Sequence, residues 1–275
     1  EIPVFGQDVE TFEGFEYLFW VGCAGAMVDR NIDVSRAMVK VMDAAGVDFA
    51  VLGNEEVCTG DPARRVGGEL TYQMCSKENI ETFERYGIKK IVTACPHCMN
   101  TLKNEYPDYG GDYEVVHHTE LIDSLMSEGR LKTKSKLDSV TYHDPCYLGR
   151  YNGEYEAPRS VLKALGIEVE EMARSGYRSR CCGGGGGAPI TDIPGKQRIP
   201  DMRMNDVRET GAELVAVGCP QCTAMLEGVV APRAEIKDIA ELVADALVID
   251  ASAEQGTSQD EATGKARRTA EEMTP

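Results

Sequence analysis

The sequence predicts an α/β fold made of two pseudo-symmetric repeats, each with a parallel sheet. Short apolar runs of four to six residues alternate with segments of helical periodicity, which is the pattern of parallel strands joined by crossover helices. The phrase Cys95-Pro-His-Cys98 also recurs as Cys219-Pro-Gln-Cys222, 124 residues later. The chain is therefore expected to be a duplicated unit of about 120 residues.

The first repeat shows the alternation most clearly. We expect its strands at 17–21, 49–52 and 88–94, and its helices at 34–45, 70–86 and 97–105. The helix at 34–45 and its counterpart at 158–165 are each followed by a glycine, Gly46 or Gly166, of the kind that closes helices. The cysteines are expected at strand ends or helix starts, where open α/β sheets hold their ligands.

The repeats divide the chain into five parts. We expect a connecting arm at 1–16, a first repeat at 17–126, a polar linker at 127–138, a second repeat at 139–250 and a disordered acidic tail at 251–275. Because the chain begins at Glu1 rather than Met, we also expect it to have been processed or cut from a longer polypeptide.

Composition excludes several classes of function. A formal charge of −17 argues against binding to nucleic acid, and no apolar run approaches the length that spans a bilayer. Ten cysteines in 275 residues are too sparse for a secreted disulfide scaffold, and no secretory leader precedes them. We expect a cytoplasmic protein that reaches the inner face of a membrane only through a partner or a missing domain.

The second repeat contains cysteines that are expected to bind a metal centre: Cys146, Cys181, Cys182, Cys219 and Cys222. Adjacent cysteines pair poorly with each other, and the glycines at 183–187 let the main chain approach a bound group with positive φ angles. Pro220 places the last two cysteines on the first turn of a helix, whose dipole favours thiolates. Five thiolates exceed the four ligands of zinc and indicate a polynuclear iron centre.

Three alternatives to iron stay open. Structural zinc is also held by CxxC pairs, although such pairs usually lie closer together in the sequence than these two. A disulfide framework conflicts with a reducing compartment. Buried, unreactive thiols are the third alternative, but such thiols need no repeated spacing.

The first repeat keeps four of the five cysteine positions: Cys23, Cys58, Cys95 and Cys98, with Val57 in place of the fifth. Four thiols suffice for a cubane [4Fe–4S] cluster. An atypical cluster and an empty relic are the other interpretations. Cys75 has no counterpart, because Ile199 occupies the equivalent position, and we expect it to be a packed helical thiol, with contact to a cluster as the alternative.

The repeated pattern of one Cys, a Cys-Cys-Gly and a CxxC resembles the cysteine-rich (CCG) domain of heterodisulfide reductases (types B and D) and of glycolate and lactate oxidation systems. The resemblance covers residues 17 to 250. Four longer phrases are similar to members that pass electrons from electron-transfer flavoprotein to a quinone: Cys58-Thr-Gly-Asp-Pro-Ala-Arg-Arg65, Cys95-Pro-His-Cys-Met-Asn-Thr-Leu-Lys-Asn-Glu-Tyr106, Val115-Val-His-His118 and Tyr142-His-Asp-Pro-Cys-Tyr-Leu-Gly-Arg150.

This resemblance implies a noncubane [4Fe–4S] centre on the five cysteines of the second repeat, where Cys181 and Cys182 would be catalytic and Gly183 and Gly184 would contact the cofactor. It implies a ferredoxin-like domain or subunit and a flavoprotein as electron partners, with a membrane-anchored subunit or domain in some relatives. For the first repeat a cubane cluster is the matching expectation.

Several other polar residues could act near such centres. His143 could donate to a cluster sulfur or protonate a departing thiolate, or could simply pair with Asp144. His97 is expected in a surface or supporting role, and the pair His117-His118 in a structural rather than a catalytic one. The arginines Arg64, Arg65 and Arg150 could offset cluster charge or hold an acidic partner, although exposure to solvent is the default for arginine.

We therefore predict an iron–sulfur oxidoreductase subunit or domain that transfers electrons between a flavoprotein or ferredoxin-type donor and a disulfide or quinone acceptor. A thiol–disulfide reductase acting on small thiol cofactors is the alternative within the same class. A zinc-stabilised interaction module without catalytic activity is the alternative from a different class. Iron and acid-labile sulfide analysis separates the two classes.

Overall fold

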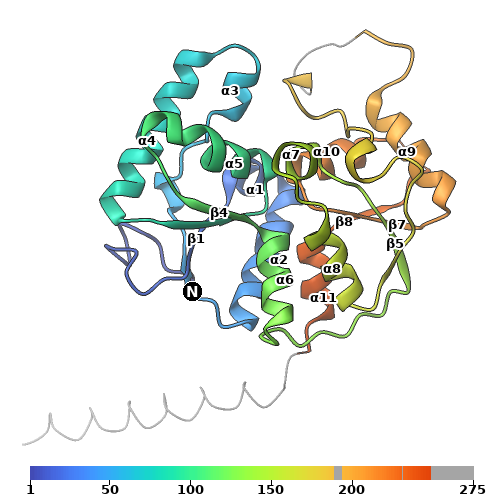
Figure 1. Cartoon of the computed structure of the whole chain (residues 1–275), viewed down its shortest axis with the longest axis horizontal. Helices are drawn as coiled ribbons and strands as arrows, with labels where there is room; N and C mark the ends of the chain where they lie inside the picture. The colour runs from blue at the N-terminus through green and yellow to red at the C-terminus, as the bar shows by residue number, and fades with distance from the viewer. Residues whose placement is uncertain (189–193, 231, 249–275) are drawn as a thin grey trace, which may run out of the picture.

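The computed structural model describes residues 1–188, 194–230 and 232–248. Two four-stranded parallel sheets have the same strand order, β2-β1-β3-β4 and β6-β5-β7-β8. The first consists of β1 (Tyr17–Trp20), β2 (Phe49–Ala50), β3 (Lys90–Thr93) and β4 (Glu114–His117), and the second of β5 (Ser139–Tyr142), β6 (Glu168–Val169), β7 (Leu214–Val217) and β8 (Glu235–Asp238). The predicted α/β fold with two repeated parallel-sheet units is confirmed (Figure 1).

Helices surround each sheet. The first unit contains α1 (Gly22–Met27), α2 (Asp29–Ala44), α3 (Asp61–Arg65), α4 (Glu69–Tyr86), α5 (Pro96–Asn100) and α6 (His118–Ser127). The second contains α7 (Cys146–Asn152), α8 (Glu156–Ala164), α9 (Ile199–Thr210), α10 (Pro220–Glu227) and α11 (Ile239–Ala246). The predicted helices are present with shifted bounds: α2 begins at Asp29 rather than at residue 34, α4 and α8 begin one and two residues early, and the helix expected at 97–105 changes at Thr101 from α to a π-helical turn.

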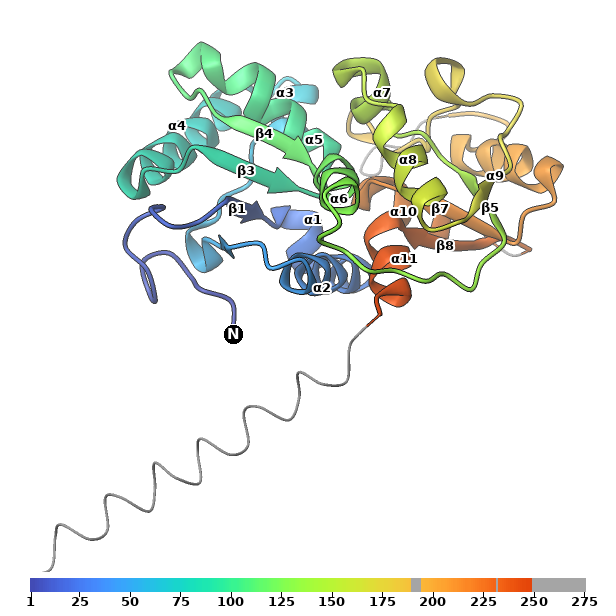
Figure 2. The same ribbon diagram turned by 60° about the horizontal axis from the view of Figure 1, so that its bottom comes forward.

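The two units share a hydrophobic core. Helices α2 and α6 of the first unit lie beside α8 and α11 of the second, in the middle of the molecule (Figures 1 and 2). Met38, Ile122, Val161 and Val243 are fully buried members of one apolar cluster that crosses this junction. Because the cluster draws on both sheets and on all four helices, the units are expected to fold against each other.

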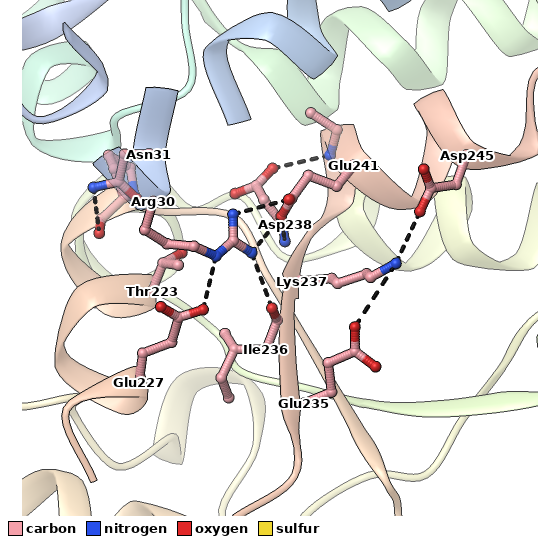
Figure 3. Close-up of polar contacts among 12 residues, drawn as sticks. Arg30, Asn31, Thr223, Glu227, Glu235, Ile236, Lys237, Asp238, Glu241 and Asp245 are labelled. Carbon is pink, nitrogen blue, oxygen red and sulfur yellow. Dashed lines mark hydrogen bonds and ion pairs between the residues drawn. The ribbon is translucent and has the colours of Figure 1, made fainter. Parts of the chain in front are cut away.

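Arg30 on α2 adds a polar tie to the second unit (Figure 3). Its Nε lies 2.7 Å from Glu227, and its two terminal nitrogens lie 2.8 and 2.7 Å from Glu241. It also donates to the carbonyl of Ile236 at 3.0 Å. These carboxylates raise the pKa of Arg30 even though burial alone would lower it. The neighbouring Asn31 donates to the Pro220 carbonyl at 3.2 Å, so α2 contacts the start of α10 directly.

A buried histidine pair joins the units at the carboxyl ends of the sheets. His118 Nε2 lies 2.9 Å from Asp238 Oδ1, and His118 Nδ1 lies 3.2 Å from His117 Nε2. All three side chains are inaccessible to solvent. His117 and Asp238 begin α6 and α11 at equivalent places, and each helix has a glutamate that bonds back to the first backbone N–H. These hydrogen bonds, which link α6 to the start of α11, account for the structural role expected for His117-His118.

The segments outside the repeats pack differently from one another. Residues 1–16 lie on the first unit, where Phe5 is buried and Val4 pairs with Val51. In the linker, Thr133 pairs with Leu247 in an antiparallel bridge. The tail expected at 251–275 lies outside the described residues. Among the described residues, no helix has the length and apolar character that crossing a membrane requires.

Candidate metal centres

The second unit brings its five cysteines together from three segments. Cys146 begins α7, Cys181 and Cys182 lie in the loop between a short 3₁₀ turn (Gly176–Arg178) and α9, and Cys219 and Cys222 lie at the start of α10. The expectation that every cysteine lies at a strand end or a helix start is wrong for Cys181 and Cys182, because the glycine run separates them from α9. Pro220 occupies the first position of α10, as predicted.

The five thiols form a continuous chain of contacts. Cys181 hydrogen-bonds to Cys146 and Cys182, Cys182 to Cys222, and Cys222 to Cys219. The thiols of Cys146 and Cys182 stabilise a thiolate at Cys181 and lower its pKa, whereas the same contacts raise the pKa of Cys146. Protons are thus shared between sulfurs that lie too close together to be charged at the same time. Metal cations are the usual replacement for such protons.

Glycine backbone supports these sulfurs. The N–H of Gly183 points to Cys181 Sγ at 3.2 Å, and the N–H of Gly184 points to Cys182 Sγ at 3.4 Å. Positive φ angles occur at Gly183, Gly186 and Gly187, which confirms the conformation expected for the run. A Cβ atom at Gly184 would lie 2.7 Å from Gln221 Cγ, so this position also has no room for a side chain.

His143 faces this group from the end of β5. One of its imidazole nitrogens lies within 4.8 Å of the sulfurs of Cys182 and Cys222. Its Nδ1 accepts a hydrogen bond from Arg203 Nε at 3.0 Å, while its buried Nε2 has no partner among the described residues. Burial, followed by the Arg203 charge, lowers the pKa of His143 to about 3. The neutral ring therefore carries its proton on Nε2, since Nδ1 is an acceptor.

The alternative pairing of His143 with Asp144 is wrong. Asp144 instead binds Arg159 at 2.7 Å and accepts from the Gly176 N–H at 2.7 Å. The partner of His143 is Arg203, a fully buried arginine on α9 that sequence reasoning missed. Its guanidinium also donates to the Arg174 carbonyl and to Ser179, which fixes the imidazole in place.

The first unit brings four cysteines together in the same way. Cys23 lies in α1, Cys58 follows the 3₁₀ turn Gly53–Glu55, and Cys95 and Cys98 lie at the start of α5. A hydrogen bond from Cys23 lowers the pKa of Cys58 to about 6, and one from Cys98 lowers that of Cys95 to about 7. The Cys98 thiol is also electrostatically coupled to Cys23 and Cys58, so the four sulfurs form one group.

The two groups are built alike. The Gly60 N–H points to Cys58 Sγ at 3.5 Å, and the N–H of Gly184, 124 residues later, makes the matching contact with Cys182. Cys75 lies in the middle of α4, as predicted, and is partly buried. Burial and then the nearby Cys58 raise the pKa of Cys75. The extra thiol therefore lies near the first group without belonging to either repeated pattern.

A cavity of about 210 Å³ lies between the units. The first unit contributes its four grouped cysteines, and the second contributes Pro220, Gln221 and the glycines at 184–187. His97 lines the cavity, bonds to Asp61 at 3.0 Å and stacks on Tyr147 of the other unit. Burial alone would lower the pKa of His97, but Asp61 and the charges of Cys219 and Cys95 raise it to about 9.

The residues present fit polynuclear iron. Each group offers soft sulfur donors from three chain segments, backbone N–H groups aimed at sulfur, and little room for side chains beside the thiols. In the first unit a Cβ at Gly22 would already lie 3.4 Å from Cys98 Sγ. In the second, the His143 imidazole lies beside the sulfurs of Cys182 and Cys222, and its Nε2 is a buried donor without a partner among the described residues. Such a donor suits a sulfur-rich anion.

Comparison with known proteins agrees with this construction. The model of the CCG family, described as a cysteine-rich domain, matches residues 17–103 and again 140–227. The "Probable membrane-anchored ferredoxin" of Chromohalobacter salexigens is 60% identical over 245 residues, which are 86% of this chain and 36% of that protein. The EtfAB:quinone oxidoreductase of Syntrophomonas wolfei is 44% identical over 251 residues, covering 86% and 35%.

A more distant relative is covered more fully. The D-type component of the dihydromethanophenazine:CoB–CoM heterodisulfide reductase of Methanosarcina barkeri is 32% identical over 263 residues, which are 89% of this chain and 62% of that protein. The chain spans only about a third of the length of the first two relatives. The duplicated cysteine pattern, the paired sheets and the two separate family matches lead to one conclusion: the chain belongs to the CCG cysteine-rich domain family and carries this domain twice.

Proposed function

We propose that this chain is the iron–sulfur, electron-transferring part of an oxidoreductase. In this proposal Cys146, Cys181, Cys182, Cys219 and Cys222 hold a noncubane [4Fe–4S] centre. The observation that carries it is the continuous sulfur chain of the second unit, which joins five thiols from three segments. The relatives named as an EtfAB:quinone oxidoreductase and a heterodisulfide reductase component support the redox class.

For the first unit we propose a cubane [4Fe–4S] cluster on Cys23, Cys58, Cys95 and Cys98. Support comes from the grouping of the four sulfurs and from the cavity beside them. A site that no longer bound a cluster would not be expected to retain a thiol-lined cavity between two packed units. The charges of His97 and Arg65 beside that cavity offset the negative charge of thiolates.

When bound, such centres supply one-electron exchange. The chain's own residues position and shield them. Gly183 and Gly184 direct N–H groups at sulfur, and His143, held by Arg203 through Nδ1, lies beside Cys182 and Cys222 with its proton on Nε2. Hydrogen bonds to sulfur stabilise the more reduced state and so raise the reduction potential.

The electron partners belong to the proposal as well. A flavoprotein or a ferredoxin-type domain would donate, and a quinone or a disulfide would accept, with attachment to a membrane's inner face through a partner or a further domain. The alternative of a thiol–disulfide reductase draws support from the cavity between the units, which has room for a small substrate beside the first sulfur group.

Metal analysis tests the proposal. We expect the anaerobically isolated chain to contain iron and acid-labile sulfide in equal amounts, about four of each per centre. About one zinc ion per unit without sulfide would instead support the zinc-stabilised interaction module and overturn the redox assignment. Reoxidation of the reduced chain by a quinone analogue, compared with a paramagnetic signal that requires an added thiol, then distinguishes the two acceptors.

A further inference from the structure

The second unit carries a basic surface that is unusual for so acidic a chain. Three arginines, Arg150, Arg174 and Arg178, are exposed there together with Tyr177, and we refer to these four residues as the arginine patch. Acidic residues outnumber basic ones by 46 to 29 in the whole chain, yet no Asp or Glu occurs in α7 or at 172–187. The patch is therefore a locally positive surface on an acidic chain.

Main-chain contacts hold the patch together. Arg150 donates to the carbonyls of Ser179 at 2.8 Å and Tyr177 at 3.3 Å, which fastens α7 to the segment before Cys181. Figure 2 shows α7 at the upper edge of the second unit, beside the yellow turn that contains residues 176–178. Arg150, Arg174 and Arg178 surround a hollow of about 460 Å³. The patch thus has a defined shape.

The positive charges of the patch have no carboxylate partner among the described residues. Within the described part of the chain, Arg174, Arg178 and Arg150 form no ion pair with a carboxylate, whereas Arg159 and Arg180 nearby each bind one. Tyr177 beside these arginines is 75% exposed, although tyrosine usually buries part of its ring. Exposed arginine and tyrosine together are typical of the energetic centre of protein interfaces.

The patch lies close to the second sulfur group. Arg150 is one helical turn after Cys146 on α7, and Arg178 precedes Cys181 by three residues. A protein bound here would approach the second unit at the two segments that carry these cysteines. The same surface is remote in sequence from the first group, whose nearby arginines, Arg64 and Arg65, are already paired with Glu105.

We propose that the arginine patch is the docking surface for an acidic electron-transfer protein, whose carboxylates enter the hollow between Arg150, Arg174 and Arg178. This inference rests on the proposed redox function and adds the place and the charge of the partner. The rest of a chain with formal charge −17 repels an acidic protein, so long-range electrostatics orients the partner toward the patch before contact. Tyr177 then supplies apolar contact area.

Binding can be tested without any electron transfer. The probe is a small acidic flavodoxin, and its affinity for the iron-loaded, oxidised chain is measured by calorimetry at several salt concentrations. We expect the double variant Arg174→Glu/Arg178→Glu to weaken binding at low salt about tenfold or more and to flatten the salt dependence. Tyr177→Ala should weaken binding while leaving the salt dependence unchanged.

The matched control is Lys77→Glu/Lys134→Glu, which makes the same charge change at exposed lysines of α4 and the linker. It should alter affinity by less than about twofold. Equal weakening by both double variants, or no binding of flavodoxin to the unaltered chain, would overturn the proposal. Binding of inorganic pyrophosphate at the patch without binding of flavodoxin would also overturn it, in favour of a small-anion site.

A second readout separates this proposal from the proposed function. Sodium dithionite reduces iron–sulfur centres without a docking surface, so it should bleach the unaltered chain and both double variants to the same extent. If no chain were reducible while flavodoxin still bound at the patch, the redox function would fail and the docking surface would stand.

Discussion

The two sulfur groups are built on the same repeat but differ in their access to solvent and ligands. In the first unit Cys23 is exposed and all four grouped cysteines line the cavity between the units. Cys95 and Cys98 are buried, as are Cys182, Cys219 and Cys222 of the second unit, whose other two grouped cysteines are partly buried rather than exposed. Of the nine grouped cysteines only the four of the first unit line that cavity. The fuller cysteine set is thus the more enclosed one.

The chain segments beside the two groups also differ in charge. The segment before the first group contains Glu55 and Glu56, and Glu56 accepts from the N–H groups of Val21 and Gly22. The segment before Cys181 is basic and leads to the arginine patch. The same repeat therefore has two different surroundings. The sulfur group of the first unit lies beside a cavity of small-molecule size, and that of the second unit lies beside the arginine patch.

The largest expected effect is the loss of one metal centre but not the other when a single cysteine is replaced. Cys181→Ala removes the sulfur that contacts both Cys146 and Cys182, so we expect the second centre and its electron paramagnetic resonance signal to be lost while the first centre remains. Cys75→Ala, the matched loss of one thiol outside both groups, should leave both signals intact. Identical spectra for the two variants would contradict the ligand assignment.

The two units also differ in how much space surrounds a glycine near each sulfur group. Gly60 has φ +84°, and a Cβ there would lie 3.1 Å from the Tyr72 Cα and 2.9 Å from its ring. Gly60→Ala should therefore lower the free energy of unfolding by about 3 kcal/mol. Gly186→Ala in the second unit, with φ +62° and open space, should cost about 1 kcal/mol. Urea unfolding measures both, and equal costs would mean that the crowding at Gly60 is relieved at no cost.

The junction between the units supplies the next effect. Arg30→Ala leaves Glu227 and Glu241 without their shared partner in a half-buried position, and we expect the free energy of unfolding to fall by about 2 kcal/mol. Arg36→Ala, on the same helix with an exposed pair to Asp33, should change it by less than about 0.5 kcal/mol. Thermal unfolding of the two variants side by side tests this, and matching melting temperatures would exclude a role for Arg30 in holding the units together.

The smallest effect is a pH dependence. Burial, followed by the neighbouring His118, lowers the pKa of His117 well below its usual value. The unfolded chain takes up this proton below about pH 6.5 and the folded chain does not, so stability is present above that pH and is lost as the pH falls. We expect His117→Gln to reduce the slope of stability against pH between 7 and 5 by up to one proton, about 1.4 kcal/mol per pH unit.

Urea unfolding at pH 7, 6 and 5 gives that slope. The variant Glu128→Gln, at an exposed acidic position at the end of α6, serves as the control and should keep the slope of the unaltered chain. An unchanged slope in His117→Gln would show that this imidazole becomes protonated in the folded chain.

Much of the fold was predictable because it is local and repeated. The spacing of Cys95 and Cys219 predicted two units, and alternating apolar runs predicted parallel strands. The partners of His143 and His97 were not predictable, since Arg203 and Asp61 reach them only after distant segments fold together. A fully buried arginine also contradicts the usual preference of its residue type, and no pattern in the sequence marks Arg203 as the exception.

The membership of each sulfur group is the central claim, and anomalous diffraction at the iron absorption edge tests it most directly. We predict two separate iron sites, one surrounded by Cys146, Cys181, Cys182, Cys219 and Cys222 and the other beside Cys23, Cys58, Cys95 and Cys98. The contradicting result is a single zinc ion on each CxxC pair, or five second-unit sulfurs with no iron among them.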